Sequence, residues 1–309
     1  SLATFIADAK VADLPEWSLH EAKRTLINII AVSLSASLAS GSRIMINWTA
    51  AEESASRSTI IGTAMRTSSF NAAMLNGFLA HLQDYDDTHF PSVLHPTAPV
   101  WPAVFAAAED RGASGKEALA AFVLGAETAC RVAMSVHPWH YDVGWHITGT
   151  AGVFGAAAGT GRILKLGPDM MNMALGAAGT LAGGVREVFG SHAKALHPAK
   201  AASNGLQAAY LTQHGFTGAD DILGGRRGFW EVLSSAGHSE DALLSDLGTR
   251  WELKMNGLKP YANGVVSHPI QDAVITLRNQ YDLKPEQVVS IQARVHPLVF
   301  ELMNRPEPR

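Results

Sequence analysis

The sequence predicts a mainly helical fold, and three observations support this prediction. Hydrophobic residues make up 47% of the 309 residues and charged residues only 17%, which is typical of an ordered chain with a large core. Apolar side chains recur at helical spacing in successive segments up to about Ser235. One clear alternation of apolar and polar residues, at 288–295, is typical of a strand. We therefore expect helices through most of the chain and a strand near its end.

The first elements follow from capping signals and periodicity. A helix is expected from about residue 18 to 38, with Ser18 as its N-cap and Glu21 completing a capping box. Its predicted buried stripe comprises Leu26, Ile27, Ile30 and Leu34. A helix over 44–55 and a short strand over 58–61 are expected next.

The middle of the chain predicts further helices separated by prolines. A helix over 70–85, capped by Ser68 or Ser69, leads into a proline-rich loop. The prolines of this loop are Pro91, Pro96, Pro99 and Pro102, and each disfavours a helical residue before it. The later helices are expected over 101–109, over 117–136 with Ser114 as N-cap, over 147–161 and over 198–214, where Pro198 lies near the first position.

A polar cluster lies between two apolar segments, at residues 84–99. It contains Asp84, Asp86 and Asp87, together with Thr88, and it ends near His95. Carboxylates and imidazoles concentrated between core helices indicate a functional site. Two other interpretations stay open: a solvated acidic loop, and a metal cluster, because Asp and His are common ligands.

Two more clusters follow. His146 precedes a Gly/Ala-rich helix, in which the small residues would let neighbouring helices approach closely, and on its own it could be an interior, hydrogen-bonded histidine. Residues 186–200 carry three fixed cations and two histidines against one acid, including Lys194, His197 and Lys200. Such a cluster at the start of a helix suits a carboxylate or phosphate, although a solvated basic turn would have the same composition.

Composition narrows the function classes. A net charge of −4 argues against nucleic-acid binding, which needs a basic face. The single cysteine, Cys130, lies in an apolar helical segment and is expected to be a packed thiol. Neither a leader-like N-terminus nor a run of about 18 uninterrupted apolar residues is present, so we expect a cytoplasmic protein without a membrane span.

Six motifs in one order resemble the MmgE/PrpD family over essentially the whole chain. They are Asn76-Gly77-Phe78-Leu79-Ala80-His81 before Asp84-Tyr85-Asp86-Asp87-Thr88, then His95-Pro96, Gly144-Trp145-His146 with Thr148-Gly149-Thr150, Lys194-Ala195-Leu196-His197 with Ala201-Ala202, Gly215-Phe216-Thr217-Gly218, and Lys259-Pro260-Tyr261 with His268-Pro269. The resemblance implies a large all-helical domain, here 1–257, and a smaller α+β lid domain, of which 258–309 is the start. Because relatives continue beyond the position of Arg309, we expect this chain to be part of a longer protein.

The resemblance also implies an activity. The family includes 2-methylcitrate dehydratases, cis-aconitate decarboxylases and iminodisuccinate epimerases, which need no metal or organic cofactor. We expect a cofactor-independent lyase acting on a small di- or tricarboxylate, with 2-methylcitrate dehydration first and decarboxylation or epimerisation as alternatives. A metal-dependent hydrolase built on the Asp84–His95 cluster and a catalytically silent carboxylate-binding relative are more distant alternatives. The family is usually dimeric, and the aromatic loop containing Trp139, Tyr141 and Trp145 is the expected homodimer surface.

The resemblance assigns the candidate site residue by residue. The expected catalytic residues are the acid/base pair His95 and His146, with Asp84 orienting an imidazole and Lys194 stabilising developing negative charge. The expected substrate-binding residues are Thr88, His197, Lys200 and Lys259. Two departures from the family pattern affect this assignment. The Thr88 to His95 spacing is one residue longer than in decarboxylase-like members, and Gly264 stands where some decarboxylases carry a further histidine.

Overall fold

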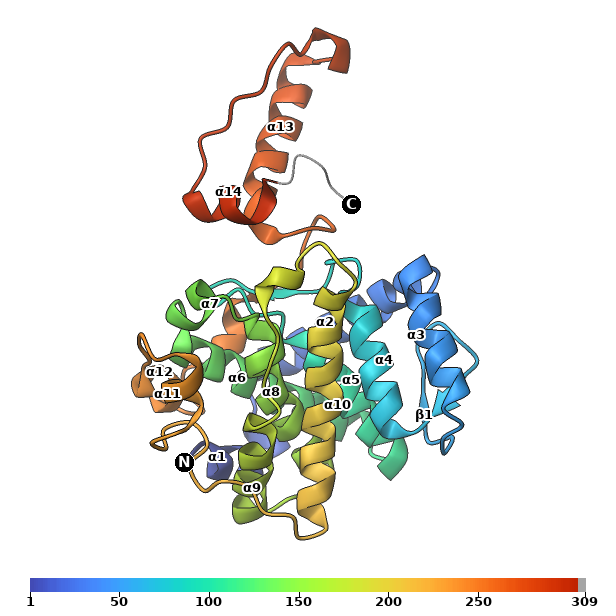
Figure 1. Cartoon of the computed structure of the whole chain (residues 1–309), viewed down its shortest axis with the longest axis vertical. Helices are drawn as coiled ribbons and strands as arrows, with labels where there is room; N and C mark the ends of the chain where they lie inside the picture. The colour runs from blue at the N-terminus through green and yellow to red at the C-terminus, as the bar shows by residue number, and fades with distance from the viewer. Residues whose placement is uncertain (305–309) are drawn as a thin grey trace. The chain divides into compact units, whose positions relative to one another are not determined.

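The computed structural model describes residues 1–304, and these form a predominantly helical chain (Figure 1). The chain divides into two units, one comprising Ser1–Leu258 and the other beginning at Lys259. This division lies beside the predicted boundary at residues 257 and 258. The end of the chain at Arg309, on which the expectation of a longer protein rests, lies outside the described residues.

Five helices form the centre of the first unit. They are α4 (Ser69–His81), α5 (Thr97–Arg111), α6 (Gly115–Val136), α8 (Ile147–Ile163) and α10 (Ala193–Gln213). Helix α8 packs against α5, α6 and α10, and α10 also packs against α4. Figure 1 shows α10 with α8 on one side and α4 on the other. This arrangement brings together the three segments that carry the predicted polar clusters.

Small residues allow the central helices to approach closely. A Cβ on Gly125 of α6 would lie 2.7 Å from the carbonyl oxygen of Gly155 in α8, and a Cβ on Gly155 would lie 2.6 Å from that of Gly125. A Cβ on Gly77 of α4 would similarly lie 2.9 Å from the Cα of Ala199 in α10. The prediction of a tightly packed Gly/Ala helix core is therefore confirmed.

The other helices and the short strands complete the first unit. The helices are α1 (Leu2–Asp8), α2 (Glu16–Ser37), α3 (Ser40–Ala51), α7 (Trp139–Val143), α9 (Pro168–Gly179), α11 (Phe229–Leu233) and α12 (Glu240–Leu244), with 3₁₀ turns at Val11–Asp13, Arg186–Val188 and Glu252–Met255. The strands are β1 (Ser58–Thr59), β2 (Arg66–Thr67), β3 (Thr88–His89) and β4 (Asn256–Gly257). They form two antiparallel pairs, β1 with β2 and β3 with β4. The β3–β4 pair ties the polar loop after α4 to the end of the first unit.

Helix α6 contains the predicted capping box and is both long and apolar. The hydroxyl of Ser114 accepts from the amide of Glu117, and the Glu117 carboxylate accepts from the amide of Ser114. Helix α6 is long and apolar enough to cross a bilayer, but 89% of its most apolar window is buried inside the fold. Its composition is therefore that of a packed core helix.

Helix α2 departs from the prediction at its start and in its buried face. It begins at Glu16, so Ser18 lies inside the first turn and donates to the carbonyl of Pro15 instead of capping the helix. Ile27 and Leu34, predicted to be buried, are 70% and 47% exposed. The inward face instead carries Thr25, whose hydroxyl accepts from the indole N–H of Trp101 at 3.1 Å. This hydrogen bond and the small neighbouring side chains favour the less apolar face.

Three predicted helix boundaries were wrong, and two of them, the starts of α5 and α10, share one reason. Helix α4 ends at His81 instead of residue 85, whereas α5 and α10 begin at Thr97 and Ala193, several residues before their predicted starts. In both α5 and α10 a proline is the sixth residue, where it removes only one internal hydrogen bond. Packing of these buried helices outweighs that loss, so proline did not delay either start.

The second unit is also helical in its described part. It contains α13 (His268–Tyr281), α14 (Pro297–Met303) and 3₁₀ turns at Val265–Ser267 and Pro285–Gln287. The strand predicted at 288–295 is wrong for the described residues, because the segment is extended but pairs with no neighbouring strand there. The helical fold class is confirmed, while the strand expected of the α+β lid is not formed by these residues.

Candidate active site

The site begins where α4 ends. His81 is the last residue of α4, and Asp84 adopts a left-handed conformation with a φ of 52° that turns the chain out of the helix axis. The chain then folds back, so that Asp86, Asp87 and Thr88 become buried. Asp86 and Asp87 therefore lie in a buried loop. The prediction that the acids lie at the end of the helix was wrong, because α4 ends at His81.

His81 and Asp86 form a buried pair. The Nδ1 atom of His81 lies 2.8 Å from Oδ2 of Asp86, and both side chains are fully buried. A carboxylate accepts only, so Nδ1 carries a proton, and in the neutral ring Nε2 carries the lone pair. This Nε2 is buried and has no hydrogen-bond partner among residues 1–304. Asp86 thus fixes the imidazole with its acceptor nitrogen available.

His95 is held by the same loop. Its Nδ1 donates to the carbonyl of Asp87 at 2.7 Å, with the hydroxyl of Thr88 at 3.2 Å and Asp86 Oδ2 at 3.8 Å. Its backbone N–H donates to the hydroxyl of Thr148 at 3.1 Å, which connects the loop to α8. The His95 ring is therefore fixed in the tautomer that has its lone pair on Nε2.

Asp87 connects the loop to α5 and β4. Its carboxylate accepts from the amide and hydroxyl of Thr97 at the start of α5 and from the side-chain amide of Asn256. Burial raises the pKa of Asp87 to about 7, and these hydrogen bonds act in the opposite direction. Asp87 therefore holds α5 and β4 against the loop that carries His95.

His146 lies at the N-terminal end of α8, and His197 lies in α10. His146 precedes α8, and its Nδ1 lies 2.8 Å from Nδ1 of His197. Burial lowers the pKa of His146 well below its usual value, and burial also lowers the pKa of His197 to about 4. Both rings are therefore neutral at neutral pH, and one of the two donates to the other.

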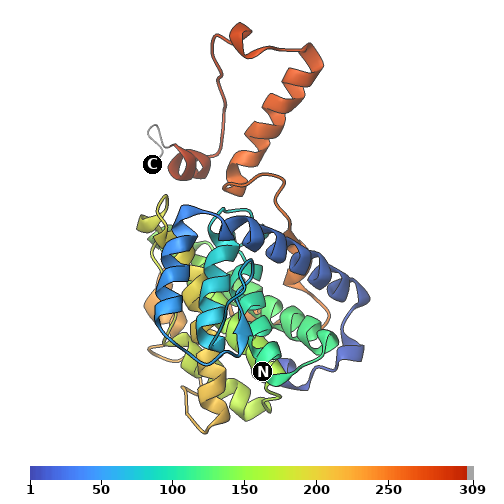
Figure 2. The same cartoon turned by 90° about the vertical axis from the view of Figure 1, so that its right-hand side faces the viewer.

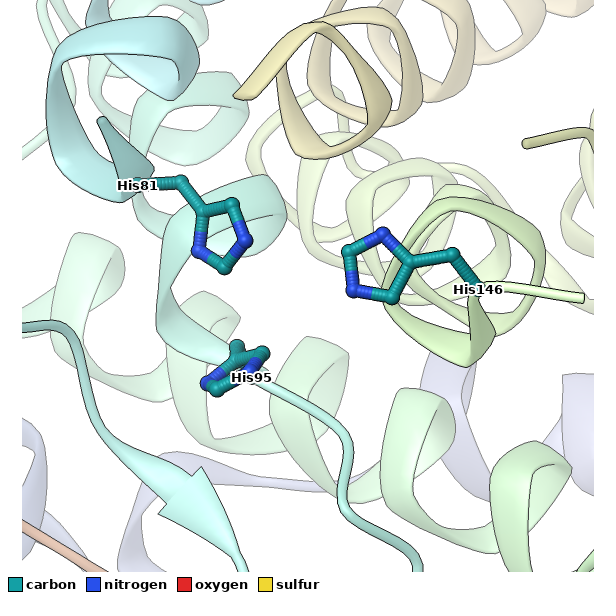
Figure 3. Close-up of side chains that lie close together, drawn as sticks. All are labelled: His81, His95 and His146. Atoms are coloured by element: carbon teal, nitrogen blue, oxygen red, sulfur yellow. The ribbon is translucent and has the colours of Figure 1, made fainter. Parts of the chain in front are cut away.

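Three histidines from different segments meet at one point. The rings of His81, His95 and His146 turn toward one another (Figure 3). The ring centroids are 4.9 Å apart for His81 and His95, 5.7 Å for His81 and His146, and 6.4 Å for His95 and His146. Their side chains are buried or nearly so. The cluster therefore offers several neutral or titratable nitrogens in a setting with little water, which suits proton transfer.

A cation pairs with an acid beside this cluster. Lys194, in the first turn of α10, places its Nζ 3.0 Å from Oδ2 of Asp84 and 5.2 Å from the centroid of the Phe189 ring. Both partners are partly exposed, at 20% and 25% of their side-chain area. An anion that enters here would meet the ammonium group at the boundary between solvent and the histidines.

The predicted residues fall into three groups. His95, His146, Thr88 and His197 lie together around the histidine cluster, and Lys194 and Asp84 lie beside it. Lys200 is exposed near the end of the second turn of α10, where its charge contributes, after burial, to the lowered pKa of His197, and its substrate contact remains a prediction. Lys259 is the first residue of the second unit, and its role remains a prediction.

Two functional candidates received no role from the sequence. His81 and Asp86 form the dyad that faces His95 and His146, and Asp86 makes the imidazole contact that was expected of Asp84. The available signal was a helix-ending histidine five residues before an aspartate in the same apolar surroundings. Predicting α4 to continue to residue 85 concealed that signal, because a helix would have separated the two side chains.

The buried histidines predict a pH dependence of stability. Burial lowers the pKa of His140 and His197 to about 4. Above pH about 6.5, the pKa of an unfolded histidine, the contribution of these lowered pKa values to the free energy of unfolding is fully present. It is lost as the pH falls toward 4, because the unfolded chain binds protons first. Asp87, with its raised pKa, has the opposite dependence and partly offsets this loss.

We therefore expect acidification from pH 7 to pH 5 to lower the free energy of unfolding by about 1–3 kcal/mol. Urea titrations at the two pH values measure the change, and the exposed-histidine variant His20→Gln should show the same difference as wild type. Equal stability at pH 7 and pH 5 would contradict this expectation, in which the loss from the histidines exceeds the gain from Asp87.

Comparison with known proteins identifies a family model and several relatives that match this chain. The model of the MmgE/PrpD N-terminal domain matches residues 1–241. A cis-aconitate decarboxylase-like protein of Aspergillus oryzae is 28% identical over 91% of this chain and 61% of its own length. The cis-aconitate decarboxylases of Aspergillus terreus and Homo sapiens are 28% and 27% identical, over 87% and 90% of this chain and 58% and 59% of theirs. The chain thus spans about three-fifths of the length of these curated relatives.

Proposed function

This chain belongs to the MmgE/PrpD family, and on that premise we propose that it is a lyase acting on a small di- or tricarboxylate without a metal or organic cofactor. The observation that carries the proposal is the enclosed cluster of His81, His95 and His146 beside the Lys194–Asp84 pair. This arrangement places nitrogens that can exchange protons next to a cation that can hold a carboxylate.

The cation and the histidines divide the work. Lys194 would exchange Asp84 for a substrate carboxylate and stabilise the negative charge that develops on it during reaction. His146 is neutral at neutral pH because of its lowered pKa, so it is suited to accept a proton. His95 would return a proton to the enolate-like intermediate, and His81, held by Asp86, is placed to relay between them.

Decarboxylation is the reaction that we place first. In this reaction the C–C bond to one carboxylate breaks, CO₂ leaves, and the electron pair remains on carbon until His95, which has first taken up a proton from solvent, protonates it. The relatives named above are decarboxylases or decarboxylase-like, whereas the sequence analysis placed dehydration of a 2-methylcitrate-like acid first. We therefore propose a cis-aconitate-like tricarboxylate as the first substrate to test.

Dehydration remains the second candidate because of one observation. Gly264 stands where some decarboxylases carry a further histidine, so this chain lacks one possible proton donor. In dehydration one group removes the proton α to a carboxylate and another protonates the departing hydroxyl. The same histidine cluster supplies both groups.

A substrate screen tests this proposal. Incubation with citrate, 2-methylcitrate, cis-aconitate or iminodisuccinate, followed by NMR, would show which acid is consumed and which bond breaks. We expect consumption of a tricarboxylate in the presence of EDTA. Turnover that disappears with EDTA and returns with a divalent metal would instead support the metal-dependent alternative.

The Lys194→Ala variant tests the carboxylate-binding cation. Loss of a charge-assisted contact worth about 1.5–3 kcal/mol should raise KM and lower kcat/KM by ~10–100-fold. Stability should change little, because the Lys194–Asp84 pair is partly exposed. The matched control is Lys165→Ala, whose side chain is 78% exposed and pairs with Glu117. Wild-type kinetics in Lys194→Ala would mean that this stretch is a solvated basic turn.

We also propose that the protein forms a homodimer, but through a surface that differs from the predicted one. The aromatic side chains of that loop pack partly against the fold, since Tyr141 is 5% exposed, Trp145 stacks on His140 and Trp139 lies against Gly237. Several exposed apolar side chains instead belong to α2 and α3, two helices at the outside of the bundle (Figure 2). They are Ile27, Leu34, Leu38, Ile44 and Trp48.

Light scattering should therefore give twice the chain mass of 32.8 kDa at micromolar concentration. The Leu38→Glu variant, at a side chain that is 80% exposed, should shift the protein toward the monomer because it places a charge in the proposed interface. Val289→Glu, at an apolar residue of the second unit that is 99% exposed, is the control. A monomer mass for the wild-type protein would contradict this proposal.

A further inference from the structure

The histidine cluster has a ligand set that proton transfer alone does not require. One nitrogen of each of His81, His95 and His146 lies within 4.8 Å of one nitrogen of the other two. Three imidazoles that bind one tetrahedral Zn²⁺ at about 2.0–2.1 Å would have ring centroids about 5 Å apart. The observed separations of 4.9, 5.7 and 6.4 Å are close to this arrangement.

Each ring is already fixed from behind through its Nδ1 atom. The partners are the carboxylate of Asp86 for His81, the carbonyl of Asp87 for His95 and the imidazole of His197 for His146. Metal-binding histidines commonly donate their second ring N–H to a carboxylate or carbonyl, which sets the tautomer and orients the other nitrogen. His81 and His95 therefore have the outer partners of metal ligands, and their Nε2 atoms carry the lone pairs.

One nitrogen is aimed into the cluster without a partner. The Nε2 of His81 is buried and has no hydrogen-bond partner among the described residues, and its ring turns this atom toward His146 (Figure 3). A buried acceptor without a donor costs free energy unless a ligand satisfies it. A divalent cation at the centre of the three rings would satisfy it.

The surrounding charge also favours a cation. Carboxylate oxygens of Asp84 and Asp86 lie within 4.8 Å of the nitrogens of His81 and His95, while Lys194 beside them is paired with Asp84. Neutral imidazoles are the nitrogen ligands that Zn²⁺, Cu²⁺ and Ni²⁺ prefer, and Mg²⁺ and Ca²⁺ prefer oxygen. The ligand set thus selects a borderline divalent cation of the zinc type.

We propose that His81, His95 and His146 form a Zn²⁺ site whose occupation inhibits the protein. Bound zinc takes up the imidazole lone pairs that accept protons, so the metal and the acid/base reaction exclude each other. The inhibitory part of this proposal rests on the proposed lyase function, whereas zinc binding itself does not.

The test begins with the whole chain freed of metal by EDTA and titrated with Zn²⁺ in a calorimeter. We expect one zinc ion per chain. His81→Gln and His146→Gln should each weaken binding by more than the ~10–100-fold that loss of an outer partner costs. Asp86→Asn, which removes only that outer partner, should weaken binding within this range. His20→Gln, at an exposed histidine of α2, is the matched control and should bind zinc as the wild type does.

A spectrum keeps the proposal falsifiable if a buried histidine variant fails to fold. Co²⁺ added to the wild-type protein should give the intense visible bands of a four- or five-coordinate ion, and zinc should displace them. A weak six-coordinate spectrum, absence of stoichiometric zinc binding, or equal zinc affinity in His146→Gln and wild type would each overturn the site.

Inhibition is then measured separately. One equivalent of Zn²⁺ should abolish turnover of the acid identified in the screen, and EDTA should restore it. Full activity of the zinc-loaded protein would overturn the inhibitory role. Absence of lyase activity under all conditions would instead refute the proposed function, and the zinc isotherm would still decide the site.

Discussion

The His146→Gln variant is expected to lose activity by ~10²–10⁴-fold, the usual contribution of a positioned general acid or base. Glutamine keeps much of the side-chain volume and can still hydrogen-bond His197, but it cannot accept a proton near neutral pH. His95→Gln should show a loss of the same order, because its ring faces the same point. Initial rates with the acid identified in the screen provide the measurement.

His20→Gln is the control for both variants, since His20 lies on the exposed face of α2 and far along the chain from the site motifs. It should retain full activity. If His146→Gln instead melted several degrees lower while its folded fraction turned over normally, His146 would be a structural histidine of the α8 layer. The proton-transfer roles would then fall to His95 and the His81–Asp86 dyad.

The Arg131→Met variant is expected to lower the free energy of unfolding by about 3–5 kcal/mol. Arg131 and Glu127 form a fully buried ion pair at 2.6 Å within α6. Arg131 also donates to the carbonyls of Leu243, Ser245 and Arg250, and Glu127 accepts from the amides of Glu252 and Leu253. Removing the cation leaves a buried carboxylate uncompensated and releases the segment that leads to β4.

Urea unfolding measures this loss. The matched control is Arg24→Met, which breaks an exposed pair with Glu21 on α2 and should cost no more than about 1 kcal/mol. A loss of less than 1 kcal/mol in Arg131→Met would mean that water reaches the Glu127 carboxylate. The segment 243–253 would then be held by its apolar contacts and by the Glu127 hydrogen bonds to the amides of Glu252 and Leu253.

The helices were predictable from the sequence because their signals are local. The Ser114 capping box and the Gly/Ala composition of α8 act within one or two turns, and both features appear as predicted. The buried face of α2 depends instead on what lies opposite, where Trp101 donates to Thr25 across a long stretch of chain. Periodicity identified the apolar face, but tertiary packing selected the other one.

The strand at 288–295 was not formed because a strand is not a local structure. Alternation specifies two faces, yet hydrogen bonds require a neighbouring strand, and the described residues of the second unit contain none at this position. The burial of Tyr141 in the predicted aromatic interface has a related origin. Composition alone does not say whether a Trp-rich loop packs inward, as Trp145 does against His140.

The sequence predicted which residues belong to the candidate site better than it predicted their hydrogen-bond partners. Ordered motifs identified His95, His146 and Lys194, and the fold brings these residues into one region. The hydrogen-bond partners were not predictable, because they depend on the left-handed turn at Asp84 and on the end of α4 at His81. Because of that turn, Asp86 hydrogen-bonds the imidazole of His81, whereas Asp84 pairs with Lys194.

The most direct measurement of the central claim is an NMR time course of cis-aconitate with the protein in excess EDTA. The account predicts that the substrate signals decay while one CO₂ is released per molecule consumed, and that His95→Gln and His146→Gln slow this decay by ~10²–10⁴-fold. Consumption of none of the four acids in EDTA, followed by hydrolysis of another substrate once Zn²⁺ is added, would contradict it.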